Sequence, residues 1–278
     1  SLPSINYSIA SLQKKVGGGS NLNFLFVNKH SFLNEKSRNR LSAYNRVGGM
    51  EFNFVSKSNL LNGKVFAMQS WTEGKNNKIA HSVGATFELN SKKISSEASL
   101  YHIGSNFNAE VGFVPRRGIL RMPADFNFRF YPKGKWGKWI NSIELGPDYD
   151  FFYGYQDKRI TDWDAGMYYR FLFSDGSSVS GSFLRWDYTY LFDDFDPTNK
   201  YAPGSKILNT GEKYTYFNNR INFFTSSRYK LVTSITGRFG EFYNGKVFSL
   251  ASNLSFRVQP YSVISLSVNY NRLRFPQG

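Results

Sequence analysis

Residues 180–192 read SGSFLRWDYTYLF, and this stretch decides the fold. From Leu184 to Phe192 every second residue is apolar or aromatic, whereas Arg185, Asp187 and Thr189 stand between them. Successive side chains of a strand point to opposite faces, so a period of two predicts a strand with one apolar and one polar face. An ordinary strand has about 5 to 6 residues, but a membrane-crossing strand needs about 9 to 11. The stretch is therefore predicted to be a membrane-crossing β-strand.

The same alternation recurs along the whole chain, in segments separated by turn residues. The alternating runs begin near Ile5, Leu22, Met50, Gly63, Val83, Ile94, Met122, Ile143, Trp163, Ser180, Phe217, Leu231, Phe248 and Ile264. Repeated alternating segments of about 10 residues are typical of outer-membrane barrels. We therefore expect an all-β fold over residues 1–278, a transmembrane antiparallel up-and-down β-barrel with about 14 strands in this chain.

Composition favours a strand-built membrane protein. The 278 residues include 27 Phe, 18 Tyr and 5 Trp, and aromatic side chains suit strands and membrane interfaces. No uninterrupted apolar stretch of about 18 residues occurs, which argues against a transmembrane helix. Zero Cys excludes disulfides and thiolate metal sites. The net charge of +15 attracts anions, but the basic residues are spread over many loops without a recognition helix, so we expect no nucleic-acid partner.

The connections between the runs alternate in length. Those after odd-numbered runs are mostly short, as at 90–93 and 174–177, whereas those after the second, sixth and tenth runs are long and those after the fourth, eighth and twelfth are intermediate. Outer-membrane barrels have short periplasmic turns and longer outer loops. This assignment places both chain ends on the outer side, although complete single-chain barrels normally have both ends in the periplasm. We therefore expect the chain to be an internal piece of a larger barrel, with strands before Ser1 and after Gly278.

The long connection at 104–117 reads GSNFNAEVGFVPRR. This string resembles a signature of a large outer-membrane family of Bacteroidota-type bacteria, and residues 21–28, 44–48, 237–239 and 242–245 are similar to the same family. The resemblance implies a C-terminal barrel of unknown function that follows an N-terminal module similar to the family-nine carbohydrate-binding fold. The match covers the barrel portion only. Some family members are named membrane-associated hydrolases, but the motif brings no catalytic residues to this chain.

His102, Ser105 and Asn106 invite comparison with the outer-membrane phospholipase, in which the Ser stands two positions after the His. The spacing of three in this chain would point the two side chains to opposite faces of a continuing strand. A nucleophile and its base must lie within hydrogen-bond reach, so we predict no catalytic residues. The other histidines, His30 and His81, give no zinc-site spacing.

Asp193, Asp194 and Asp196 form an oxygen-rich loop after the tenth run. Such loops can hold calcium, although this one lacks the EF-hand pattern, and a plain solvated outer loop is the alternative. We expect no other metal and no cofactor.

Charged residues between the apolar positions of four consecutive runs are expected to face the lumen. They are Arg129, Asp148, Asp150, Asp162, Asp164, Arg170, Arg185 and Asp187. They could line an aqueous pore or hold a plug, or they could form cross-strand ion pairs that only stabilise the wall. A second, basic set is expected to contact lipid phosphates or a partner because aromatic rings stand beside it, and a generic basic surface is the alternative. This set is Arg116, Arg117, Lys133, Lys135 and Lys138.

We therefore expect a multi-pass, porin-like protein of the bacterial outer membrane that serves as a channel, transport or assembly component, without catalysis in this segment. Its expected partners are the lipid bilayer, lipopolysaccharide and other outer-membrane complex subunits. Two alternatives remain open: a membrane-embedded hydrolase acting on lipid or glycan, and a soluble β-rich binding module.

Overall fold

The computed structural model describes residues 3–33, 42–197 and 208–276. These residues form long strands and one short helix, α1 (Gly134–Gly137). The strands are β1 (Ile5–Gly17), β2 (Ser20–Ser31), β3 (Tyr44–Val55), β4 (Leu61–Thr72), β5 (His81–Asn90), β6 (Ile94–Ile103), β7 (Ile119–Phe130), β8 (Ile140–Gly154), β9 (Arg159–Phe173), β10 (Ser178–Tyr190), β11 (Lys213–Phe224), β12 (Leu231–Phe242), β13 (Gly245–Val258) and β14 (Ser262–Arg274). Each predicted run corresponds to one strand, so the prediction of an all-β chain is confirmed.

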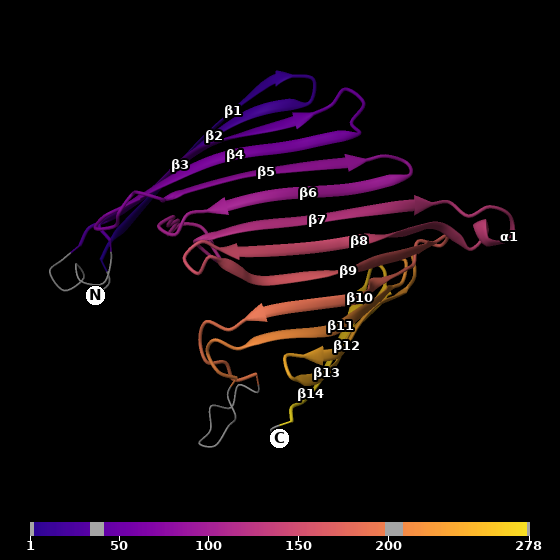
Figure 1. Ribbon diagram of the computed structural model, residues 1–278. Helices are drawn as coiled ribbons and strands as arrows, with labels where there is room; N and C mark the ends of the chain where they lie inside the picture. The colour runs from indigo at the N-terminus through magenta and orange to yellow at the C-terminus, as the bar shows by residue number, and fades with distance from the viewer. Residues whose placement is uncertain (1–2, 34–41, 198–207, 277–278) are drawn as a thin grey trace. The chain divides into compact units, whose positions relative to one another are not determined.

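The strands form a 14-stranded antiparallel sheet whose spatial order is the chain order from β1 to β14 (Figure 1). Antiparallel neighbours need only a turn or a loop between them, which agrees with the predicted up-and-down topology. β1 and β14 are the two ends of this order, and both are exposed along their whole length.

The chain divides into two compact units. The first contains Ser1–Ser91, Ser96–Ala124 and Phe151–Ile160, and the second contains Lys92–Ser95, Asp125–Asp150 and Thr161–Gly278. β1 to β5 therefore belong to the first unit and β10 to β14 to the second.

The strands of the first unit have an apolar face and a polar face. Met50 of β3 is the cross-strand partner of Phe24 of β2, and these side chains are 53% and 41% exposed. On the other face, Asn23 Nδ2 donates to Glu51 Oε1 at 3.3 Å, and Asn53 Nδ2 donates to the same oxygen at 2.8 Å. The polar side chains thus bond across the strands, while the apolar ones are left exposed.

The second unit has the same polarity. Trp186 and Phe217 are cross-strand partners with ring centroids 5.3 Å apart, and Trp186 is 47% exposed. On the polar face, Thr236 Oγ1 donates to Asn222 Oδ1 at 3.0 Å. Among the buried side chains of the residues described, polar ones outnumber hydrophobic ones. Soluble proteins bury mainly apolar side chains, so the arrangement in these strands is inverted.

β10 contains a β-bulge in the stretch that predicted the fold. Phe183 and Trp186 are three steps apart on β10, but their partners on β9 are only two steps apart. Leu184 has a φ of 52°, in the left-handed region, and both Phe183 and Leu184 are exposed. The bulge therefore adds one residue to the apolar face and leaves Arg185 on the polar face, in keeping with the ability of bulges to re-aim side chains.

We expect Leu184→Val to lower the free energy of unfolding by about 1 kcal/mol, because a β-branched side chain is strained at positive φ. The matched change Leu250→Val, at an exposed position of β13, should cost less than about 0.5 kcal/mol, because Val suits a regular strand. Urea unfolding of both variants measures the difference. An equal loss in the two variants would show that the left-handed conformation of Leu184 is not required.

Candidate functional site

The loop between β6 and β7, residues 104–118, is tied to the polar face of β3 and β4; we name it the docked loop. The N–H of Asn108 donates to Ser70 Oγ at 2.9 Å, and its C=O accepts from Asn45 Nδ2 at 2.8 Å. The same Asn45 amide donates to Thr72 Oγ1 at 2.8 Å. Asn45 and Ser70 are each only 1% exposed. Buried amides and hydroxyls are costly unless they are hydrogen-bonded, so this network fixes the loop against the strands.

Glu110 is the charged anchor of the docked loop. Its carboxylate accepts from Lys29 Nζ at 2.7 Å and from Ser42 Oγ at 2.9 Å, and its N–H donates to Asn45 Oδ1 at 3.0 Å. Burial alone would raise the pKa of Glu110. The hydrogen bonds from Lys29, Ser42 and Asn108, together with the Lys29 charge, outweigh burial and hold this pKa below its ordinary value of 4.5.

The second half of the docked loop folds back on the first. Arg117 donates to Asn108 Oδ1 at 2.6 Å. The Arg116 guanidinium lies 5.1 Å from the centre of the Phe152 ring, and Arg121 of β7 lies at the same distance from that ring. Arg116 and Arg117 thus both have partners within the protein, and their contact with lipid phosphate stays a prediction.

Arg185 of β10 organises a second polar cluster, in the second unit. It forms salt bridges with Asp148 at 2.6 Å, with Asp164, and with Asp187 at 3.6 Å. Asp164 and Asp187 are direct cross-strand partners, a position where like charges repel. Arg185 offsets that repulsion and joins carboxylates of β8, β9 and β10. The structure therefore brings together four of the residues that the sequence predicted for the lumen.

A hollow of about 230 Å³ lies beside Arg185, and Tyr168, Asn218 and Arg220 also line it. These side chains offer hydrogen-bond donors and acceptors of several kinds. The hollow therefore suits a polar solute or water better than an apolar ligand.

The other predicted lumen residues lie on β7, β8 and β9. Arg129 pairs with Glu144 at 2.7 Å, and the sequence interpretation did not select Glu144. Asp150 and Asp162 also have interaction partners, and Arg170 lies on β9. Whether these residues line a pore stays a prediction.

The predicted calcium loop shows a different use of its carboxylates. Asp194 Oδ1 accepts from the N–H and the hydroxyl of Thr210, both at 2.8 Å. Asp196 is 3% exposed, whereas Asp193 is exposed. Within residues 3–33, 42–197 and 208–276, no group of three or more His, Cys, Asp or Glu side chains could hold a metal ion. Calcium binding by this loop therefore gains no support from the geometry.

His102, at the end of β6, has aromatic partners. Its Nδ1 lies 3.0 Å from the hydroxyl oxygen of Tyr155, and its ring stacks on His81 with a centroid distance of 5.0 Å. The hydrogen bond of His102 thus goes to Tyr155 and not to Ser105. This geometry offers no activated nucleophile.

The predicted basic turn between β7 and β8 includes α1 and is exposed. Lys133, Lys135 and Lys138 are exposed, and Trp136 and Trp139 are 72% and 75% exposed. Cations and indole rings are accessible together here, and their contact with lipid headgroups or a partner stays a prediction.

The docking of residues 104–118 is the feature that the sequence interpretation missed. The contact residues on the strands are Asn45, Ser70 and Thr72. Nothing in their neighbouring sequence distinguishes them from other polar residues on a strand with one polar face. One signal was present: residues 44–48 and 104–117 share the family resemblance, and they meet through Asn45 and Asn108.

No family model matches the chain, and no curated protein or solved structure matches it either. None of the helices in the described part of the chain is long and apolar enough to span a membrane. The family resemblance therefore rests on the quoted residues alone.

Acidification is expected to release the docked loop. Because the pKa of folded Glu110 lies below 4.5, its carboxylate contributes stability that is present above about pH 4.5 and is lost as the pH falls through the depressed value. Hydrogen exchange at the amides of Asn108 and Glu110, corrected for intrinsic rates, should quicken in that range. Glu110→Gln should abolish this pH-dependent step, whereas Glu88→Gln, near the short-turn end of β5 and away from the docked loop, should keep it. An unchanged step in Glu110→Gln would rule out this carboxylate as the anchor.

Proposed function

We propose that the chain is part of an outer-membrane β-barrel that passes a polar solute through its polar interior, with the docked loop narrowing the route. The inverted polarity of the strands carries this proposal. Large exposed apolar surfaces mark contacts with a membrane or with another protein. An apolar band outside and polar groups inside are what a transmembrane barrel needs.

Strand length and backbone hydrogen bonding support the same proposal. The strands have 10 to 15 residues, and about 9 to 11 suffice to cross the hydrocarbon. In a bilayer every backbone polar group needs a partner, so a sheet can span the bilayer only when it is closed. The proposal therefore includes closure of the sheet, with new neighbours for β1 and β14.

Loop lengths support one orientation. The connections after β6 and β10 are long and those after β5 and β9 are short, although the connection after β7 has nine residues and the one after β12 has only two. Outer-membrane barrels carry their long loops on the outer side. We name the end of the strands that carries the connections after even-numbered strands the long-loop end, and we assign it to the outer face of the membrane.

The docked loop favours passage of a solute over a purely structural role. A loop tied to the polar face by Asn45, Ser70 and Lys29 would occupy part of the interior and leave a narrower polar route. Pore width and lining groups together determine which solutes pass. The Arg185 cluster and its polar hollow would form part of the lining.

The proposed setting is the outer membrane of a Bacteroidota-type bacterium, with lipopolysaccharide in the outer leaflet. A component of a larger assembly is the second candidate, and one observation favours it. Phe113, in the docked loop, is 88% exposed, and an exposed aromatic side chain can anchor a partner subunit.

A charge placed on the apolar face should cost more in the middle of a strand than near its end. We expect Met50→Arg to lower the free energy of unfolding from phospholipid vesicles by about 2–4 kcal/mol, and Phe54→Arg, nearer the turn on the same face, to lower it by about 0–1 kcal/mol. Refolding into vesicles over a urea series measures both. Costs near zero at both positions, as expected for exposed residues in water, would contradict the membrane assignment.

Weakening the hydrogen bonds of the docked loop should widen the proposed solute route through the barrel. Asn108→Ala removes the side-chain bonds to Thr72, Glu110 and Arg117, so planar-bilayer recordings should show a larger and noisier single-channel conductance than wild type. Asn90→Ala is the matched control, because Asn90 is exposed at the short-turn end of β5, away from the docked loop, and it should leave the conductance unchanged. The absence of ion conduction by an inserted wild-type protein would contradict the channel and favour the assembly role.

A further inference from the structure

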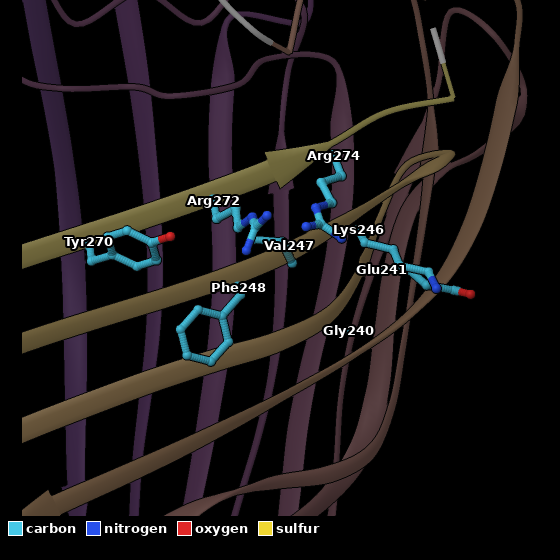
Figure 2. A pocket seen from close by; sticks show the side chains of 8 residues that line it. All are labelled: Gly240, Glu241, Lys246, Val247, Phe248, Tyr270, Arg272 and Arg274. Carbon is cyan, nitrogen blue, oxygen red and sulfur yellow. The ribbon is translucent and has the colours of Figure 1, made fainter. Parts of the chain in front are cut away.

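A basic pocket lies at the long-loop end of β12 to β14. Its volume is about 560 Å³, and Lys246, Arg272 and Arg274 contribute cationic side chains to it. Figure 2 shows Lys246, Arg272 and Arg274 near one end of β13 and β14, with Phe248 and Tyr270 farther along the strands. Neither the sequence interpretation nor the proposed solute route uses these residues.

The register places the pocket on the apolar face. Lys246 is the cross-strand partner of Arg274, and Phe248 is the partner of Arg272. Residues two apart on a strand share a face, so the three cations share theirs with Phe248 and Tyr270. The Phe248 and Tyr270 rings pack edge to face at 6.3 Å. Along one face the order is therefore cationic and then aromatic.

The same face continues as an aliphatic surface. Its next exposed side chains on β13 and β14 are Leu250, Val268, Leu266 and Ile264, which are 40% to 65% exposed. A lipid with an anionic headgroup has the matching order, with charge first and hydrocarbon after it. Free phosphate would use the cations but would have no use for the aliphatic surface.

The pocket has an excess of positive charge. Its one acidic lining residue is Glu241, the cross-strand partner of Lys246, and Glu241 Oε2 accepts from the N–H of Phe217 at 3.0 Å. Among the described residues, no salt bridge joins a carboxylate to Lys246, Arg272 or Arg274. Like charges held together repel, so an anion with more than one negative charge would be stabilised here.

We propose that this pocket binds the phosphate groups of a phosphorylated glycolipid of the lipid A class, whose acyl chains lie along the aliphatic surface of β13 and β14. This site rests on the proposed membrane function, which places the long-loop end in the outer leaflet. Arginine suits phosphate because its planar fork of donors matches the phosphate oxygens. Pairing of another strand with the free edge of β14 would occur in the plane of the sheet and would leave this face open.

The test uses the full chain in phosphatidylcholine nanodiscs that contain bisphosphorylated lipid A. Bound lipid A is quantified by native mass spectrometry over a concentration series. The variant K246Q/R272Q/R274Q removes the three cations, and K57Q/K92Q/K93Q removes three exposed lysines from the short turns as a matched control. We expect each cation to contribute about fivefold to the apparent affinity for lipid A. The loss of all three should therefore weaken binding by the first variant on the order of a hundredfold. The control should bind like wild type.

Two further measurements distinguish binding of lipid A from binding of free phosphate. Lipid A without its phosphates should bind wild type weakly, and inorganic phosphate should not displace the bound lipid. Equal binding by K246Q/R272Q/R274Q and wild type, or equal binding of the dephosphorylated lipid, would overturn the site while leaving the membrane function standing. Displacement by inorganic phosphate would assign the pocket to free phosphate instead. Failure of wild type to insert into nanodiscs would remove the membrane function and this site with it.

Discussion

The rest of the structure depends on the alternation of side chains across extended strands. Because successive side chains point to opposite faces, one stretch of sequence specifies two surfaces at once. In β3, Met50 and Phe52 build the apolar surface, while Glu51 and Asn53 build the polar hydrogen-bond network. A slip of one residue would exchange the two surfaces. Polar bonding on one face and apolar exposure on the other therefore select the same register.

This constraint explains why the strands could be predicted from the sequence, since a period of two is a local property. The sequence also contains a weaker signal for the bulge in β10. Ser180 and Ser182 are polar at even positions, whereas Leu184 and Trp186 are apolar at even positions. Such a change of parity within one strand requires an extra residue, and the structure places it at Leu184. Arg185 consequently stays on the polar face, where the alternation had predicted it.

The docked loop could not be predicted in this way, because its contacts join distant parts of the chain. Lys29 and Glu110 are 81 residues apart, and Asn45 and Asn108 are 63 apart. No local period encodes such a pairing, and its formation has to offset the entropy of fixing the loop. The Arg185 cluster was predictable for the opposite reason, since Asp148, Asp164 and Asp187 all follow from face assignment on adjacent strands. Sequence pattern thus identified the charged cluster on β8 to β10 but not the loop that is tied to β3 and β4.

The positions of charge on the apolar face give an independent measure of the proposed hydrocarbon layer. On β13 the face carries Lys246 and then no charged residue from Phe248 to Val258. Ten steps along a strand are about 33 Å, and at a tilt of about 40° they rise about 25 Å, the height of the apolar band in outer-membrane barrels. On β3 a charge on this face, Arg46, also stands near the long-loop end, two residues after the strand begins. A surface selected only for strand pairing would have no reason to keep its charges at the ends, whereas a surface facing hydrocarbon would.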